Sequence, residues 1–261
     1  MKADEQSGRA RDRGPHTGRL SGHRVAVVGG TRGIGLAIAE CAQAHEAIVT
    51  IGGRDAKRRR EALAALNDKN VAALQLDATD DESVDSFFAT TGPVDHLVVS
   101  IAGEEGQPVP FLETDTDRLR EHFDRTFWAS FRSVKAFARQ APRTATSSIV
   151  LISGGLSRRP MVGKSAYTMS QWAIEGLARS LVGEVAPVRV NVLVPGLVES
   201  PRWDFLPPAE RSAFFEIAAA SLPTGFIAGT SAIATAAVEL MANRYISGST
   251  LVVDGGWTAV S

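Results

Sequence analysis

The feature that most constrains the fold is a regular alternation of short apolar runs with longer amphipathic stretches. Seven runs are rich in β-branched residues and almost continuously apolar, which is typical of parallel strands buried on both faces of a sheet. These runs span residues 24–28, 47–52, 71–76, 96–100, 148–153, 188–194 and 250–253. The stretches between them, such as 33–44 and 56–66, have helical periodicity. The alternation predicts a single α/β domain with a doubly wound parallel sheet of about seven strands and helices on both faces.

Composition excludes several classes of partner. The chain has 261 residues, 44% of them hydrophobic, and a formal net charge of −1, so we expect no nucleic-acid partner. No apolar run approaches the roughly 18 residues of a membrane helix, so we expect no membrane partner either. The single cysteine, Cys41, excludes an intrachain disulfide and suits a reducing compartment, which predicts a cytoplasmic protein.

Two segments lie outside the alternation. Residues 1–22 combine charged residues and glycine without the apolar segment of a secretory signal, so we expect a flexible N-terminal tail before a domain at 23–261. Residues 199–226 follow the sixth run and hold a short amphipathic helix between prolines. Because ligands bind beyond the carboxyl ends of the strands in an open sheet, we expect this segment to cover the substrate pocket. A subunit contact or additional core is an equally open alternative. The aromatic residues of the segment are Trp203, Phe205, Phe214 and Phe215.

A glycine-rich loop, VVGGTRGIGLAIAE, joins the first run to the first helical stretch. Gly29, Gly33 and Gly35 have a G-x-x-x-G-x-G spacing. Gly29 permits a tight turn, and the other two let main-chain amides approach a pyrophosphate at the helix N-terminus. Between a strand and a helix this pattern predicts a dinucleotide site. The other residues of the loop that we assign to cofactor binding are Thr31, Arg32 and Ile34.

The end of the second run indicates which dinucleotide binds. Folds selective for NAD usually have an acidic residue there that binds the ribose hydroxyls. This chain has Gly53 followed by Arg54, and Arg32 lies in the glycine loop. Two guanidinium groups beside the adenosine ribose favour a 2′-phosphate. The sequence therefore predicts NADP(H) in preference to NAD(H), the alternative being two ordinary surface arginines.

Five further motifs follow the glycine loop in the order of a known family. They read LDATD (76–80), SIAG (100–103), YTMSQ (167–171), RVNVLVPGLVES (189–200) and ISGSTLVVDGG (246–256). On these motifs the chain resembles the short-chain dehydrogenase/reductase family over residues 23–258. The resemblance implies a Rossmann-type subunit, a nicotinamide cofactor, a small-molecule substrate and a homo-oligomer, either a tetramer or a dimer.

The resemblance also implies where the cofactor lies. Asp77 and Ala78 would border the adenine, and Ala102 and Gly103 the inner ribose. The residues expected to face the nicotinamide carboxamide are Pro195, Gly196, Val198 and Ser200.

Of the four positions that carry catalysis in this family, only Tyr167 is unchanged. The family's asparagine aligns with Thr126, its serine with Gly154 and its lysine with Gln171. In the family's reductases the tyrosine donates a proton, while the lysine binds the nicotinamide ribose and lowers the tyrosine pKa. Gln171 can keep the ribose hydrogen bonds because an amide both donates and accepts, but it supplies no charge. We therefore predict Tyr167 and Gln171 as catalytic residues, with Ser153 as a neighbouring replacement for the missing serine.

Other groups could compensate for the missing lysine. Glu104 or Glu105, after the fourth run, could act as a general acid or base if buried, the alternative being exposed loop carboxylates. Cations before Tyr167 could supply charge or bind an anionic substrate, or could lie in a solvated loop. These cations are Arg158, Arg159 and Lys164. His96 and His122 match no metal or triad spacing, so we expect no metal site.

Three functions are compatible with this sequence. The first is an NADPH-dependent reductase of a carbonyl or imine in an apolar small molecule, with Tyr167 as the proton donor. The second is a redox-silent enzyme of the same fold that catalyses isomerisation, cyclisation or elimination, for which binding and shape suffice without a lysine. The third is a non-catalytic NADP(H)-binding subunit or sensor.

Overall fold

The computed structural model describes residues 18–101, 103 and 108–260, and its centre is a seven-stranded parallel sheet. The strands are β1 (Arg24–Val28), β2 (Ile48–Gly53), β3 (Val71–Gln75), β4 (His96–Val99), β5 (Ser148–Ile152), β6 (Arg189–Pro195) and β9 (Thr250–Val253). Their order is β3-β2-β1-β4-β5-β6-β9, so the direction of winding reverses between β1 and β4. All seven predicted strands are confirmed, each within one residue of its predicted ends.

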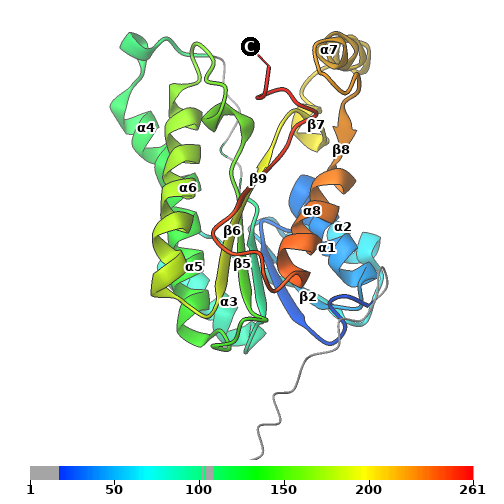
Figure 1. Ribbon diagram of the computed structural model, residues 1–261, viewed down its shortest axis with the longest axis vertical. Helices are drawn as coiled ribbons and strands as arrows, with labels where there is room; N and C mark the ends of the chain where they lie inside the picture. The colour runs from blue at the N-terminus through cyan, green and yellow to red at the C-terminus, as the bar shows by residue number, and fades with distance from the viewer. Residues whose placement is uncertain (1–17, 102, 104–107, 261) are drawn as a thin grey trace, which may run out of the picture.

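Helices cover both faces of the sheet (Figure 1). They are α1 (Gly33–Ala44), α2 (Ala56–Leu66), α3 (Asp81–Thr91), α4 (Thr116–Phe123), α5 (Ala129–Gln140), α6 (Ser165–Glu184), α7 (Pro208–Ala220) and α8 (Thr230–Ala242). Buried side chains of α1, α2 and α8 form one apolar core, and those of α3, α5 and α6 form the other. Val25 and Val27 of β1 point into the first core, whereas Ala26 and Val28 point into the second. Burial on both faces is why the inner strands, such as β4, β5 and β6, read as continuous apolar runs.

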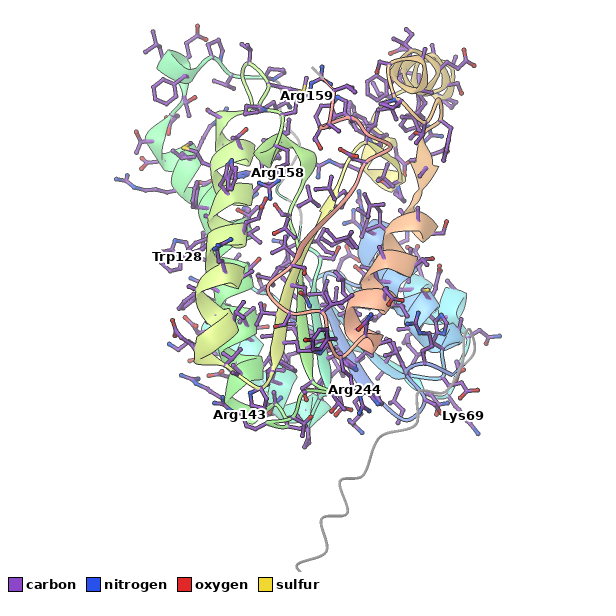
Figure 2. The ribbon with its side chains drawn as sticks, in the orientation of Figure 1. Lys69, Trp128, Arg143, Arg158, Arg159 and Arg244 are labelled. Atoms are coloured by element: carbon purple, nitrogen blue, oxygen red, sulfur yellow. The ribbon has the colours of Figure 1, made fainter. Side chains whose placement is uncertain are left out.

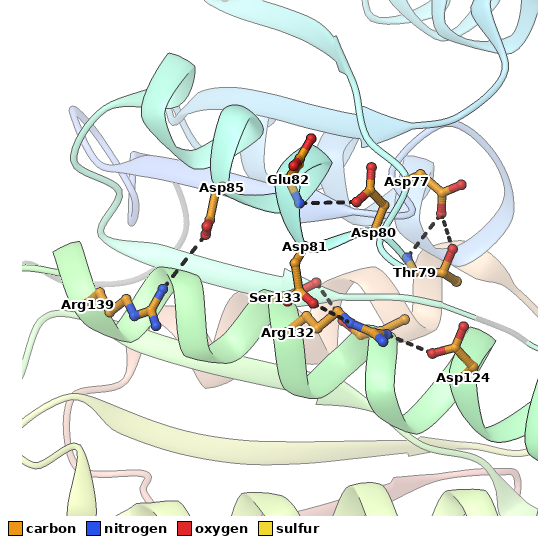
Figure 3. A network of polar contacts seen from close by, with 11 residues as sticks. Asp77, Thr79, Asp80, Asp81, Glu82, Asp85, Asp124, Arg132, Ser133 and Arg139 are labelled. Atoms are coloured by element: carbon orange, nitrogen blue, oxygen red, sulfur yellow. Dashed lines mark hydrogen bonds and ion pairs between the residues drawn. The ribbon is translucent and has the colours of Figure 1, made fainter.

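Short elements complete the described chain. They are η1 (Phe111–Glu113), the π-helical turn η2 (Asp124–Trp128), η3 (Gly155–Ser157), η4 (Pro201–Trp203) and the parallel pair of β7 (Val198–Glu199) with β8 (Ala228–Gly229). The π-helical turn joins α4 to α5. The guanidinium of Arg132 holds it against α3, with Nη1 2.9 Å from Asp124 Oδ1 and Nε 3.5 Å from Asp81 Oδ2 (Figure 3). Such turns are rare and frequently lie at functional sites.

At the amino ends of the strands the buried polar groups bind one another. His96 is fully buried, with Nε2 2.8 Å from His23 Nδ1 and Nδ1 2.8 Å from Ser148 Oγ. Burial, with the charges of His23 and Arg189, lowers the pKa of His96 to about 3. The buried Arg189 guanidinium donates to the main-chain carbonyls of Ala145, Leu240, Met241 and Ile246. Around His96 and Arg189, this end of the sheet is closed by satisfied hydrogen bonds.

The packed part of the chain extends further towards the N-terminus than the predicted domain start. Leu20 is fully buried in the first core, and its amide donates to His45 O at 3.2 Å. The end of the predicted tail, residues 1–22, therefore packs on the domain, while residues 1–17 lie outside the described residues.

The predicted fold class is confirmed as a single α/β domain with a parallel, doubly wound sheet. Among the helices of the described residues, none combines the length and apolar character needed to cross a membrane.

Candidate active site

The glycine loop between β1 and α1 leaves open space at the start of the helix. Gly29 has a φ of 80°, and a Cβ there would overlap the carbonyl oxygen of Ser100 on the neighbouring strand. Gly33 has a φ of 57°, and a Cβ built on it meets no atom within 4 Å. Because the first amides of a helix point outward with a positive partial charge, these residues fit a pyrophosphate at this position.

The end of β2 lies against the same loop. The amides of Gly29 and Gly30 donate to Gly52 O at 3.1 and 3.3 Å. A Cβ at Gly53 would lie 2.5 Å from Thr31 Cγ2, so an acidic side chain at this position would require Thr31 to move. This packing accounts for the absence of a carboxylate where NAD-selective folds usually place one.

Two arginines border this corner of the site. Arg32 lies at the N-cap of α1, is exposed, and donates to Pro201 O at 3.3 Å. Arg54 directly follows β2 and acts on the carboxylate of Asp77. Burial opposes ionisation of Asp77, but hydrogen bonds from Thr79 (2.7 and 3.0 Å; Figure 3) and the charges of Arg54 and Arg125 outweigh it, so the Asp77 pKa is lowered.

Tyr167 lies in the first turn of α6 and is half-buried. Its ring packs edge to face with the ring of His122 on α4, with centroids 4.7 Å apart and planes at 64°. His122 Nε2 lies 2.9 Å from Ser170 Oγ, which donates to Tyr167 O. Burial and the charge of Arg202 lower the His122 pKa, which favours the neutral imidazole.

Two cations lie over the Tyr167 ring. Lys164, the N-cap residue of α6, has its Nζ 5.4 Å from the ring centroid. Arg202, on η4, has its guanidinium carbon 5.8 Å from the same centroid. The phenol thus has two positive neighbours, although position 171 carries none.

Gln171 and Gly154 form a complementary pair. Gln171 Oε1 accepts a hydrogen bond from the amide of Ser157 at 2.9 Å. A Cβ at Gly154 would overlap the Gln171 amide nitrogen. The glutamine side chain therefore occupies space that a serine at position 154 would need, so these two departures from the family pattern belong to one local arrangement.

The Ser153 hydroxyl is directed towards the middle of α6. It lies 3.2 Å from Gln171 O and 3.1 Å from Glu175 Oε1. Glu175 also forms an ion pair with Arg158, which lies beside α6 (Figure 2). The Arg158 guanidinium carbon lies 4.6 Å from the centre of the Trp172 ring. Arg159 donates to Trp257 O at 2.9 Å. The two arginines contact these partners, whereas Lys164 contacts Tyr167.

The remaining predicted residues follow other strand ends. Gly103 lies against His122, since a Cβ there would come within 2.8 Å of the His122 Nδ1. Thr126 lies in the π-helical turn and donates to His122 O at 2.6 Å. Residues on the β6 side are Pro195 at the end of that strand, Gly196, Val198 on β7 and Ser200 at the start of η4. Ala78 and Ile34 are partly buried. Ala102, Glu104 and Glu105 lie outside the described residues.

Two neighbours of Tyr167, namely His122 and Arg202, could not be recognised from the sequence. His122 was set aside because it matches no metal or triad spacing, and its place beside Tyr167 arises only when α4 packs on α6. Arg202 lies 35 positions after Tyr167 in the sequence, and only the path of η4 brings it near. Within the part of the chain that the structure describes, no cluster of three or more His, Cys, Asp or Glu could hold a metal ion.

Known proteins share this combination of fold and motifs. A family model described as Enoyl-(Acyl carrier protein) reductase matches residues 28–258. The chain therefore belongs to the short-chain dehydrogenase/reductase family. The galactitol 2-dehydrogenase (L-tagatose-forming) of Cereibacter sphaeroides is 34% identical over 254 residues, which cover 92% of this chain and 96% of the relative.

Two solved structures superpose on almost the whole chain. The MalC Reductase/Diels-Alderase of Malbranchea aurantiaca has a TM-score of 0.86 at 27% identity, over 93% of this chain and 99% of its own. An NADPH-bound short chain oxidoreductase of Pseudomonas aeruginosa PAO1 that contains an atypical catalytic center has a TM-score of 0.85 at 28% identity, over 95% and 100%.

Proposed function

We propose that this protein is an NADP(H)-dependent reductase of a carbonyl or imine in an apolar small molecule, with Tyr167 as the proton donor. One observation carries the proposal. Pro201 accepts a hydrogen bond from Arg32 of the glycine loop, and the next residue, Arg202, lies over the Tyr167 ring. Pro201 thus contacts the glycine loop, and its neighbour Arg202 contacts Tyr167. The glycine loop and Tyr167 are therefore close enough, in our proposal, for one dinucleotide to contact both.

The chain's own residues divide the work of such a reaction. When bound, a nicotinamide cofactor supplies the hydride. Tyr167 then donates its phenolic proton to the substrate oxygen or nitrogen, so that an alcohol or amine forms and the phenolate takes a proton back from solvent. Gln171, fixed by the Ser157 amide, would contact the ribose through its own amide. An iminium substrate would need less help from Tyr167, because it already carries the positive charge.

NADP(H) is the proposed cofactor because Arg32 and Arg54 border the ribose corner while Gly53 leaves it without a carboxylate. NADPH is bound in the Pseudomonas aeruginosa structure, which supports a nicotinamide cofactor here. The preference for NADPH is measured by the ratio of kcat/KM with NADPH to kcat/KM with NADH. Arg32→Ala and Arg54→Ala should each lower this ratio by about tenfold, because each variant loses one charge-assisted hydrogen bond. The matched control is Arg58→Ala in α2, which should leave the ratio unchanged.

The segment 199–226 is proposed to cover the substrate pocket. It lies beyond the carboxyl ends of the strands, where α7 stands at one side of the sheet (Figure 1). Its aromatic residues contact one another, with the Trp203 and Phe214 ring centroids 4.9 Å apart, and Phe205 is 63% exposed. This apolar character supports a substrate with an apolar or aromatic part.

A redox-silent reaction is the second candidate. The ordered pairing of Gln171 with Gly154 favours it, because a neutral amide fixed in this way suits binding and shape more than proton transfer. The similarity to the MalC Reductase/Diels-Alderase of Malbranchea aurantiaca also supports it. Such an enzyme would catalyse isomerisation, cyclisation or elimination.

Absorbance of NADPH with a panel of ketones and cyclic imines tests the proposal. Consumption of NADPH that depends on the substrate is the expected result. Formation of a product without consumption of NADPH would support the redox-silent alternative. Binding of NADPH without any product would support a sensor or non-catalytic subunit.

A homo-oligomer, tetramer or dimer, is also proposed. Trp128 at the end of η2 and Trp172 on α6 are 47% and 51% exposed, which is a large apolar surface for a monomer to leave in water. Light scattering coupled to gel filtration measures the assembly directly. A cytoplasmic location remains part of the proposal because a single cysteine suits a reducing compartment.

A further inference from the structure

Tyr167 needs a positive neighbour to be an effective acid. A free phenol has a pKa of about 10, and an opposite charge within about 4–6 Å of an ionisable group favours its charged form. Gln171 cannot provide that charge, and its side chain is fixed by the Ser157 amide over Gly154. The charge therefore has to come from another part of the fold.

Among the described residues, three titratable or charged side chains face the Tyr167 ring, and they come from three places. They are His122 on α4, Lys164 at the N-cap of α6 and Arg202 on η4. The two cations lie within 6 Å of the ring centroid, the range in which a cation interacts with an aromatic face. A phenolate is attracted to them more strongly than a neutral phenol, because its negative charge is shared between the oxygen and the ring.

The charge of Arg202 reaches the interior of the site. Burial and then the charge of Arg202 lower the pKa of His122. A neutral His122 adds no charge to the Tyr167 ring that it touches at 4.7 Å. Among the described residues that face the phenol, the positive charges are therefore those of Arg202 and Lys164.

We propose that Arg202, supported by Lys164, supplies the positive charge that the family's lysine would supply at position 171. Arg202 acts through Tyr167 and is therefore a positioning residue. The inference rests on the proposed function, because it explains how Tyr167 donates a proton. The inference also makes the acidity of Tyr167 depend on the segment 199–226, because Arg202 belongs to it. Pro201, the residue before Arg202, accepts a hydrogen bond from Arg32 of the glycine loop.

The chain has only two tyrosines, which permits a direct titration of the phenol. Tyr245 is 99% exposed, so Tyr245→Phe leaves Tyr167 as the sole tyrosine without disturbing the core. In this background the ionisation of Tyr167 is followed by NMR of ring-labelled tyrosine, with circular dichroism to monitor the fold. The variants are Arg202→Met, Arg202→Lys and Lys164→Met.

The parent should titrate below the free-phenol value of about 10, and Arg202→Met should raise the Tyr167 pKa by about one unit. Lys164→Met should raise it by less, and Arg202→Lys should keep most of the lowering because it keeps the charge. The control is Arg211→Met, which removes a cation from α7 that forms an ion pair with Asp204, with Nη1 2.6 Å from Oδ1. It should leave the titration unchanged.

An unchanged titration in Arg202→Met would overturn the inference. So would a parent phenol that stays neutral up to the alkaline limit of the fold, because the pKa would then not be lowered. The titration needs no turnover, which separates the two proposals. A lowered pKa without NADPH consumption contradicts only the reductase, and NADPH consumption with an unperturbed phenol contradicts only the role of Arg202.

Discussion

The two ends of the parallel sheet use polar side chains in opposite ways. At the amino ends, His96 and Arg189 are buried and their hydrogen bonds run to other side chains and to carbonyls of the same fold. At the carboxyl ends, Tyr167 is half-buried, Arg32 is exposed, and Gly33 leaves open space beside a helix N-terminus. The comparison separates polar groups that stabilise the domain from those available to a ligand. Changes at the first end should affect unfolding, and changes at the second should affect the reaction.

The largest expected effect is on catalysis at the carboxyl ends. Tyr167→Phe removes the proton donor and should lower kcat by roughly 10² to 10⁴, the usual contribution of general acid catalysis. NADPH affinity, measured by fluorescence titration, should change little. Tyr245→Phe is the matched control, because its side chain is 99% exposed and lies on the loop before β9. Equal rates in the Tyr167→Phe variant and the wild type would mean that another group donates the proton.

At the amino ends, Arg189→Met should destabilise the domain and leave the reaction intact. The substitution leaves buried main-chain carbonyls without their donor, at a cost of at least about 3 kcal/mol in the free energy of unfolding. Urea denaturation measures this loss. Arg244→Met, at an exposed position nearby, should change stability by less than about 0.5 kcal/mol. Similar losses in the two variants would contradict a structural role for the Arg189 contacts.

The fold was largely readable from the sequence, because the inner strands are largely buried on both faces and so are apolar almost throughout, while the edge strands β3 and β9 are partly exposed. The cores on the two sides explain why seven runs could be located to within one residue. The pair β7 and β8 was missed because strands of two residues have no periodicity. The π-helical turn at Thr126 was missed because one extra residue in a helix leaves no signature in a single sequence.

The site was less predictable, because its key contacts join elements that are distant in sequence. Motif spacing predicted the glycine loop and Tyr167 as site residues, and in the fold the loop directly follows β1 while Tyr167 lies in the first turn of α6. The position of the Gln171 side chain beside Gly154 could not be predicted, because the sequence does not show in which direction a side chain points. Lys164 was one of three cations considered, and only packing distinguishes it from Arg158 and Arg159.

Acidification should lower the free energy of unfolding through His96, at the amino ends of the strands. Its pKa is about 3 in the fold, against an ordinary value of 6.5, because of burial and then the charges of His23 and Arg189. Below about pH 6.5 the unfolded state binds a proton that the folded state does not, so stability is full above this pH and falls as pH decreases. Between pH 6.5 and pH 5 the loss from this group is about 2 kcal/mol.

Urea denaturation at several pH values, in the wild type and in His96→Gln, isolates this contribution. The glutamine variant should be less stable at neutral pH but should lose less stability on acidification. Parallel curves for the two proteins would show that His96 is not the group responsible.

The smallest expected effect is on the coupling between Gly154 and Gln171. Gly154→Ser should push the Gln171 side chain away from the main-chain amide of Ser157. The loss of this contact should weaken NADPH binding by about 1 kcal/mol. Because Gln171→Ala disrupts the same contact, the double variant should lose less than the sum of the two single changes. Calorimetric titration of NADPH gives the cycle, and strict additivity would mean that the two positions are independent.

The central claim is that Tyr167 delivers a proton to the atom whose neighbouring carbon receives hydride. Mass spectrometry of the product formed with NADPH deuterated at nicotinamide C4 tests this most directly. The account predicts that one deuterium enters the product carbon and that Tyr167→Phe greatly slows its appearance. A product that contains no deuterium, formed while NADPH is not consumed, would contradict the account and support the redox-silent alternative.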